Sequence, residues 1–193
     1  MKIAVYNFKG GVGKTSISLG YALNQGFAVV TNDYHSPLER VLSEKYIIKL
    51  KSDESMPIFD DGLNIVFDLG GSIDERAVSA IKQADWVIIP TVNSVVDLHM
   101  TLQTINQVSD YNSKVLVIVN KLERGDFEIA KEVIVEFFPS MPIFPLKNSK
   151  IFKKMFEKEQ SLNGIANLNG LNKYTYRSVI SQFADITEFI NNN

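Results

Sequence analysis

The sequence contains no cysteine. This absence excludes disulfides, thiolate metal sites, iron–sulfur clusters and cysteine nucleophiles. The sequence also lacks an excess of charge of one sign, because 20 lysines and arginines nearly balance 22 aspartates and glutamates and leave a net charge of −2. A surface that is cationic throughout is therefore excluded, although a local basic patch could still bind nucleic acid.

Long apolar runs are absent too. No stretch approaches the roughly 18–20 apolar residues that span a bilayer, and the first residues show neither a basic nor an apolar leader region. Apolar residues nevertheless make up 45% of the chain, enough to build a substantial core. We therefore expect a soluble cytoplasmic protein with one domain over residues 1–193.

Short, β-branched apolar runs alternate with amphipathic helical patterns along the chain. The runs predict strands over 3–7, 27–32, 63–68, 86–90, 114–120 and 141–146. The helical patterns fall at 15–25, 37–45, 72–84, 94–109, 126–138, 150–159 and 173–191. Between them, 46–62 suggests a short edge strand and a loop, and the Asn/Gly-rich stretch 163–172 a loop. This alternation predicts an α/β domain whose mostly parallel sheet carries helices on both faces.

A glycine-rich stretch, FKGGVGKTS, stands between the first predicted strand and the first predicted helix. Glycines allow close approach of the backbone, so that successive N–H groups can point at phosphate oxygens, and the helix N-terminus adds its dipole. The common P-loop pattern places a glycine five residues before Gly13, where this chain has Phe8. The residues expected to bind the nucleotide here are Gly10, Gly11, Val12, Gly13, Lys14, Thr15 and Ser16.

The motif K-G-G-V-G-K-T resembles the deviant Walker A motif of the ParA/MinD family of dimerising ATPases, closest to the short plasmid-partition type. The resemblance implies a P-loop NTPase-like three-layer fold with ATP and Mg²⁺ as ligands. It also implies that Lys14 contacts the phosphates of its own ATP, that Thr15 holds Mg²⁺, and that Lys9 reaches the ATP of a second subunit. ATP binding and homodimer formation would then depend on one another.

Two positions after the second predicted strand correspond to the family's D-x-D motif. Asp33 takes the place of the first aspartate, and His35 takes the place of the second, which positions the attacking water in the family. A neutral imidazole could still accept a proton from water, whereas a misplaced or protonated one could not. We expect slow hydrolysis or none, unless His35 is simply an exposed loop residue.

Further residues at strand ends extend the resemblance. Asp68 ends LNIVFD, which resembles the Walker B strand, and would hold Mg²⁺; by itself, an aspartate there could equally be a helix N-cap. Asn120 corresponds to a family asparagine that hydrogen-bonds adenine, although asparagine at a strand end is more often a turn residue. The segment with Pro145 and Leu146 corresponds to backbone that lines the base.

Basic residues gather near the C-terminal end of the chain. The stretch 147–158 has five lysines and one glutamate, and the family binds DNA non-specifically through basic residues in this region. The bland alternative is a solvated lysine face. The candidate DNA-binding residues are Lys147, Lys150, Lys153, Lys154, Lys173 and Arg177.

The resemblance as a whole implies a partition or positioning ATPase whose ATP-bound dimer binds nucleoid DNA. A small centromere-binding or adaptor protein would stimulate its slow hydrolysis. The end of the chain, ISQFADITEFINNN, is acidic to neutral, which argues against binding to anionic membranes. Two alternatives remain open, namely an ATP-binding dimerisation scaffold without turnover, motivated by His35, and a P-loop metabolic synthetase.

Overall fold

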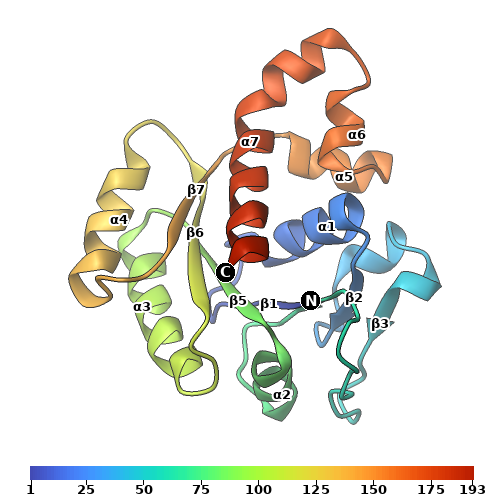
Figure 1. Ribbon diagram of the computed structural model, residues 1–193, viewed down its shortest axis with the longest axis vertical. Coiled ribbons are helices and arrows are strands. Elements are labelled where there is room, and N and C mark those ends of the chain that lie inside the picture. Colours follow the sequence, from blue (N-terminus) through green and yellow to red (C-terminus); the bar gives the residue numbers. More distant parts are fainter.

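A computed structural model describes residues 1–193. Its centre is one seven-stranded sheet in the order β3-β2-β4-β1-β5-β6-β7, in which every neighbouring pair is parallel (Figure 1). The strands are β1 (Lys2–Val5), β2 (Ala28–Thr31), β3 (Ile47–Lys49), β4 (Ile65–Asp68), β5 (Trp86–Thr91), β6 (Val115–Leu122) and β7 (Ile143–Lys147).

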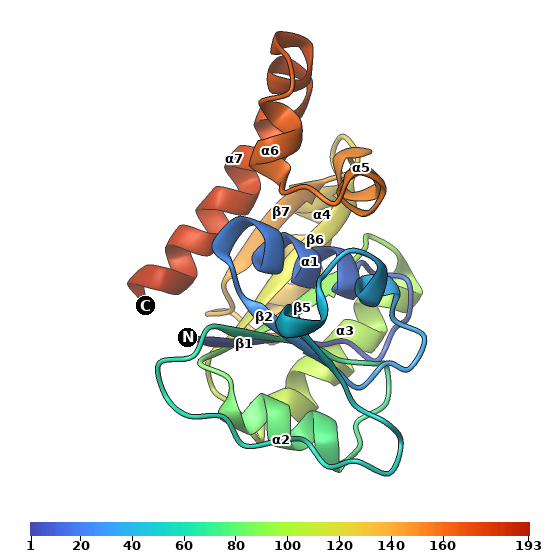
Figure 2. The ribbon, with the colours of Figure 1, turned by 90° about the vertical axis from the view of Figure 1, so that its right-hand side faces the viewer.

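The helices cover both faces of this sheet. They are α1 (Lys14–Gln25), α2 (Glu75–Gln83), α3 (Val95–Ser109), α4 (Asp126–Phe137), α5 (Ile151–Lys158), α6 (Leu162–Ala166) and α7 (Gly170–Asn192). Helices α2, α3 and α4 lie on one face, and α1, α5, α6 and α7 lie on the other (Figures 1 and 2). The predicted P-loop NTPase-like three-layer architecture is therefore confirmed.

The buried residues form two cores, one on each side of the sheet. In β1, Ile3 and Val5 belong to the core under α1 and α7, whereas Ala4, together with Tyr6 directly after the strand, belongs to the core under α2 and α3. Successive side chains of a strand point to opposite faces, so a strand that is covered on both faces must be apolar throughout. For this reason, the strands appear in the sequence as continuous apolar runs and could be predicted from them.

Two predicted segments differ from the structure. The helix predicted over 37–45 is wrong: this segment forms two short 3-10 turns, η1 (Pro37–Arg40) and η2 (Glu44–Tyr46), which lead into the edge strand β3. Only two residues of this segment, Leu38 and Leu42, are buried. Two apolar anchors do not define the stripe that a longer helix buries.

The loop predicted over 163–172 is also wrong, because α6 and the first turn of α7 occupy most of it. Ser161 caps α6 by accepting a hydrogen bond from the Gly164 amide, and Asn169 caps α7 by accepting one from the Asn172 amide. Polar residues that favour turns are also the preferred N-caps, so their composition alone could not separate a loop from two helix starts. Together, α6 and the first half of α7 project away from the sheet (Figure 2).

No helix is both long enough and apolar enough to cross a membrane.

Candidate nucleotide site

The candidate site lies at the carboxyl ends of the central strands. The loop between β1 and α1 passes over this edge, and Asp68 and Asn120 come from the ends of β4 and β6. In open α/β sheets, ligands bind at this edge, where helices on opposite faces diverge. The topology therefore gathers residues that are more than 100 positions apart in sequence.

The loop presents a run of free backbone donors. None of the amides of residues 10–16 donates a hydrogen bond within the protein, whereas the flanking amides of Lys9 and Ile17 are bonded to Asn7 Oδ1 and to the Gly13 carbonyl. Left-handed backbone at Gly11 (φ 81°) and Gly13 (φ 102°) gives the loop its concave course. We call the amides of residues 10–16 the amide cradle; such a run forms a binding site for an anion.

Lys14 opens α1, directly after the cradle's last glycine. Its ammonium donates to the carbonyls of Asn7 at 3.0 Å and Lys9 at 3.1 Å. Burial lowers the pKa of Lys14, and the nearby carboxylates of Asp68 and Asp33 partly oppose this shift. Lys14 is thus a partly desolvated cation at the cradle. An anionic ligand bound there would stabilise its positive charge further.

Asp68 is almost completely buried at the end of β4, with 1% of its surface exposed. One carboxylate oxygen accepts a hydrogen bond from Ser18 Oγ at 2.9 Å, and the other has no partner. Burial raises the pKa of Asp68 to about 6, while the Ser18 and Thr15 hydroxyls and the Lys14 ammonium act in the opposite direction. Asp68 caps no helix, since α2 has Asp74 as its N-cap, so the helix-cap alternative is wrong.

An unpartnered buried carboxylate oxygen fits a magnesium ligand. The structure contains no group of three or more His, Cys, Asp or Glu that could hold a metal ion. Magnesium in phosphate sites commonly uses one or two protein oxygens and completes its shell with water and substrate phosphates. The Asp68 carboxylate and the Thr15 hydroxyl therefore match such a partial ligand set, and the pairing stays a prediction.

The two candidate hydrolytic residues differ in their surroundings. Asp33 is near enough to influence the pKa of both Lys14 and Asp68. His35 is exposed, and its ring packs edge-on against Tyr34 with centroids 5.5 Å apart. Asp33 Oδ1 accepts a hydrogen bond from the His35 amide at 3.0 Å, which fixes the turn between them. Asp33 therefore acts electrostatically on Lys14 and Asp68, whereas the His35 ring lies exposed against Tyr34.

Asn120 is buried beside the cradle. Its amide donates to the Val12 carbonyl at 2.8 Å, and a Cβ added to Gly13 would lie only 2.2 Å from that amide nitrogen. On the neighbouring strand, Pro145 pairs with Val119, and the Leu146 side chain is fully buried in the core. Only the backbone of Leu146 is thus free to line a ligand, and the adenine contacts stay predictions.

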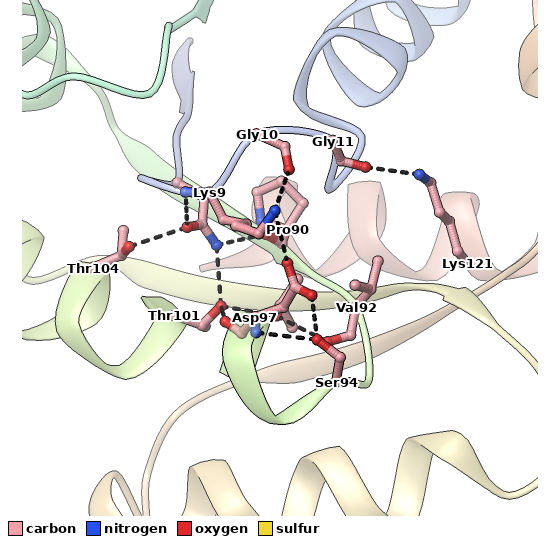
Figure 3. Close-up of polar contacts among 12 residues, drawn as sticks. Lys9, Gly10, Gly11, Pro90, Val92, Ser94, Asp97, Thr101, Thr104 and Lys121 are labelled. Carbon is pink, nitrogen blue, oxygen red and sulfur yellow. Dashed lines mark hydrogen bonds and ion pairs between the residues drawn. The ribbon is translucent and has the colours of Figure 1, made fainter. Parts of the chain in front are cut away.

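Sequence reasoning missed several polar partners of this loop. Asn7 is fully buried; its amide donates to the Pro90 carbonyl at 2.8 Å and to Thr101 Oγ1 at 3.0 Å (Figure 3). The Asn7 carboxamide oxygen accepts from the Lys9 amide, which joins the loop to β5 and α3. In the sequence, Asn7 is a polar residue at the end of an apolar run, and this pattern does not indicate which residues it contacts.

The basic candidates fall into separate groups. Lys147 and Lys150 line a shallow hollow against Thr175 and Ser178 of α7, and Lys154 lies over the ring of Tyr176 at 5.1 Å. Lys153 instead pairs with Glu157 at 3.4 Å and lines a hollow that Arg40 of η1 shares. Lys173 and Arg177 are exposed on the projecting half of α7. Arg40 is a basic neighbour that the sequence did not reveal.

No protein-family profile and no curated protein matches this sequence. Solved structures do match its fold. Apo McdA of Cyanothece superposes with a TM-score of 0.65 at 15% identity, covering 97% of this chain and 98% of that chain. A plasmid partition protein from Borrelia burgdorferi bound to AMPPNP gives 0.56 at 13% identity, covering 95% and 98%. The septum site-determining protein MinD of Pyrococcus horikoshii, complexed with Mg-ADP, gives 0.59 at 16% identity, covering 86% and 89%.

These structural neighbours are partition and positioning proteins of the ParA/MinD type, and two of the three were solved with a nucleotide. At such identities the likeness establishes the fold. The ParA/MinD resemblance inferred from the Walker A motif is thereby confirmed at the level of the fold.

Proposed function

We propose that this chain, with the fold of the ParA/MinD-type ATPases, is an ATP-dependent partition or positioning ATPase. The observation that carries the proposal is the amide cradle of residues 10–16, which lies beside the partly buried ammonium of Lys14 and the unpartnered Asp68 carboxylate oxygen. Free amides, a cation and a single magnesium-type ligand together match a nucleoside triphosphate with its metal.

Each part of the site has a role in this proposal. The cradle amides and Lys14 bind the phosphates, and Thr15 and Asp68 hold Mg²⁺, which when bound neutralises phosphate charge. Asp33 orients the attacking water, and Asn120 with the backbone at Pro145 and Leu146 lines the base. Catalysis of this kind depends on positioning and on electrostatic stabilisation.

Dimerisation and DNA binding complete the proposal. Lys9 lies at the rim of the cradle with its side chain 39% exposed, where a second subunit can approach it. The six candidate DNA-binding residues would bind DNA phosphates without reading bases, and a two-fold dimer would double their number. A small adaptor protein would stimulate hydrolysis and thereby release the DNA, which makes the protein nucleoid-associated.

A scaffold that binds ATP and dimerises without turnover is the second candidate, favoured by His35 in place of an aspartate and by its exposed position. A metabolic synthetase is less well supported, because neither Lys9 nor the basic residues would serve it.

The decisive experiment measures ATP binding and hydrolysis with and without duplex DNA. We expect ATP binding, slow turnover, and DNA binding only in the ATP form. Lys14→Ala should weaken ATP binding by about 10- to 150-fold or more, because a charge-assisted contact to phosphate contributes about 1.5–3 kcal/mol. Lys82→Ala, which removes an exposed lysine from α2, is the matched control. Binding without turnover would select the scaffold, DNA-independent turnover would favour a synthetase, and no ATP binding would refute the proposal.

A further inference from the structure

Lys121 has an unusual backbone conformation at the edge of the candidate site. Its φ is +55°, and it shares left-handed backbone with only one other non-glycine residue, Glu159, which is the C-cap of α5. This conformation costs roughly 1–2 kcal/mol for a residue with a side chain, unless a short polar side chain compensates. Such residues persist where the surrounding structure holds them, and they gather at functional sites.

The conformation belongs to a β-bulge. In the pairing of β6 with β7, Val119 stands opposite Pro145 and Leu122 opposite Lys147, so that Asn120 and Lys121 together face Leu146 alone. An extra residue of this kind redirects side chains that would otherwise alternate between the two faces of the sheet. The Lys121 amide donates to Asn120 Oδ1 at 2.8 Å, which ties the two bulge residues to each other.

Both bulge side chains reach the same loop. Asn120 Nδ2 donates to the Val12 carbonyl at 2.8 Å. Lys121 Nζ donates to the neighbouring Gly11 carbonyl at 2.7 Å (Figure 3). Two neighbouring residues of β6 thus hold two successive backbone carbonyls of the loop that carries the amide cradle. In an unbulged strand, side chains at positions 120 and 121 would point to opposite faces.

Holding these carbonyls sets the direction of the adjacent amides. In a planar trans peptide, the carbonyl of one residue and the N–H of the next point in opposite directions. The Gly11 carbonyl held by Lys121 therefore turns the Val12 amide away from the bulge, and the Val12 carbonyl held by Asn120 does the same for the Gly13 amide. Neither amide has an acceptor within the protein.

We propose that Lys121 is a positioning residue for phosphate binding: from its bulge, it holds the Gly11 carbonyl so that the cradle's amides are preset toward the ligand. This proposal rests on the proposed nucleotide-binding function. Preorganised donors bind an anion without the entropic cost of ordering the loop. The effect of Lys121 should therefore fall on the phosphates, whatever base the nucleotide carries.

The test compares Lys121→Met, Lys121→Asn and Lys121→Arg with the parent, using fluorescent ATP and tripolyphosphate as probes. We expect Lys121→Met to weaken the affinity for both probes by about tenfold and by the same factor, because only the cradle is affected. Lys121→Asn, which suits left-handed backbone but cannot reach Gly11, should lose as much. Lys121→Arg keeps a donor of similar length and should restore affinity to within about threefold.

The matched control is Lys114→Met. Lys114 immediately precedes the same strand at its other end, and its ammonium also donates to a backbone carbonyl, that of Asn193, at 2.8 Å. This variant should bind both probes like the parent, and all variants should unfold within a few degrees of it without ligand.

Three results would overturn the proposal. The first is parental affinity in Lys121→Met, and the second is a loss confined to ATP, which would make Lys121 a base contact. The third is full affinity in Lys121→Asn, which would assign the effect to backbone strain. Failure of the parent to bind either probe would instead refute the proposed function, and this inference with it.

Discussion

The Lys9 ammonium lies 3.8 Å from the Asp97 carboxylate, so the residue expected to serve a second subunit is paired within its own chain. Lys9 also donates to the Gly10 carbonyl at 3.3 Å, and Asp97 lies in the first turn of α3 (Figure 3). With the Lys9 side chain 39% exposed, such a pair contributes at most about 1 kcal/mol. The pairing therefore holds Lys9 near the cradle's rim yet releases it at little cost.

Replacing Lys9 tests its role between subunits. Lys9→Ala should leave the ATP affinity of the monomer within about threefold of the parent, since Lys14 and the cradle remain. It should remove ATP-dependent dimers, measured by light scattering with a non-hydrolysable analogue. Asp97→Asn, which frees Lys9, should change the ATP concentration needed for dimers by less than about fivefold. Normal dimerisation and turnover in Lys9→Ala would contradict the trans role.

Asp33 and His35 can be separated by turnover measurements. Asp33→Asn should lower the rate of ATP hydrolysis about tenfold or more, because its carboxylate lies near Lys14 and Asp68. His35→Ala should have little effect, since the ring is exposed, and His35→Asp should raise a slow parental rate by adding the second carboxylate of the D-x-D motif. An unchanged rate in Asp33→Asn would show that the water is positioned by another group.

The buried Asp68 carboxylate predicts a characteristic pH dependence. Its pKa is raised from 3.8 to about 6, so the folded state binds more protons than the unfolded state between these values. Its stabilising contribution is complete below pH 3.8 and is lost as the pH rises through 6, about 3 kcal/mol in total. Without nucleotide, Asp68→Asn should therefore be more stable than the parent at pH 7.5, and equally stable near pH 4.

Urea unfolding in EDTA across this pH range measures the difference. Asp60→Asn, which changes an exposed carboxylate, is the control and should follow the parent. Added Mg-ATP should stabilise the parent at pH 7.5 but not Asp68→Asn. A stability difference between the parent and Asp68→Asn that does not vary with pH would show that the buried carboxylate is not the titrating group.

The basic residues are tested by the salt dependence of DNA binding. Lys150, Lys153 and Lys154 changed together to alanine should flatten the slope of log affinity against log salt, by up to about 5 units in a dimer. Lys153 is expected to contribute least, because it is paired with Glu157. ATP affinity should not change, and binding should stay independent of DNA sequence.

A charge-matched triple variant, Lys45→Ala with Lys82→Ala and Lys131→Ala, controls for the loss of three positive charges outside these residues. If the Lys150, Lys153 and Lys154 variant keeps its affinity and slope, the DNA surface lies elsewhere, with Lys173, Arg177 and Arg40 next to test. Absence of DNA binding by the ATP-loaded parent at low salt would refute nucleoid association.

The sequence alone was sufficient for the layered α/β fold and for the position of the glycine-rich loop between β1 and α1. Strands such as β5 are buried on both faces, so their side chains are largely apolar and form recognisable runs in the sequence. Gly11 and Gly13 adopt left-handed backbone, which favours glycine, so the turn is recognisable from these two residues. Both requirements restrict the residue types within a short segment of the chain, so a local sequence pattern reveals them. The loop predicted over 163–172 failed for a related reason, because Ser161 and Asn169 favour caps and turns alike.

Only the tertiary structure decided which residues surround that loop. Asn7 reaches Thr101, Lys9 reaches Asp97, and Lys121 reaches Gly11, across separations that no local pattern encodes. The parallel sheet brings the carboxyl ends of β1, β4, β5 and β6 to one edge, and the bulge at Asn120–Lys121 then turns two side chains onto the cradle. Hydrogen bonds between distant segments depend on strand order and register, so they became visible only once the chain was folded.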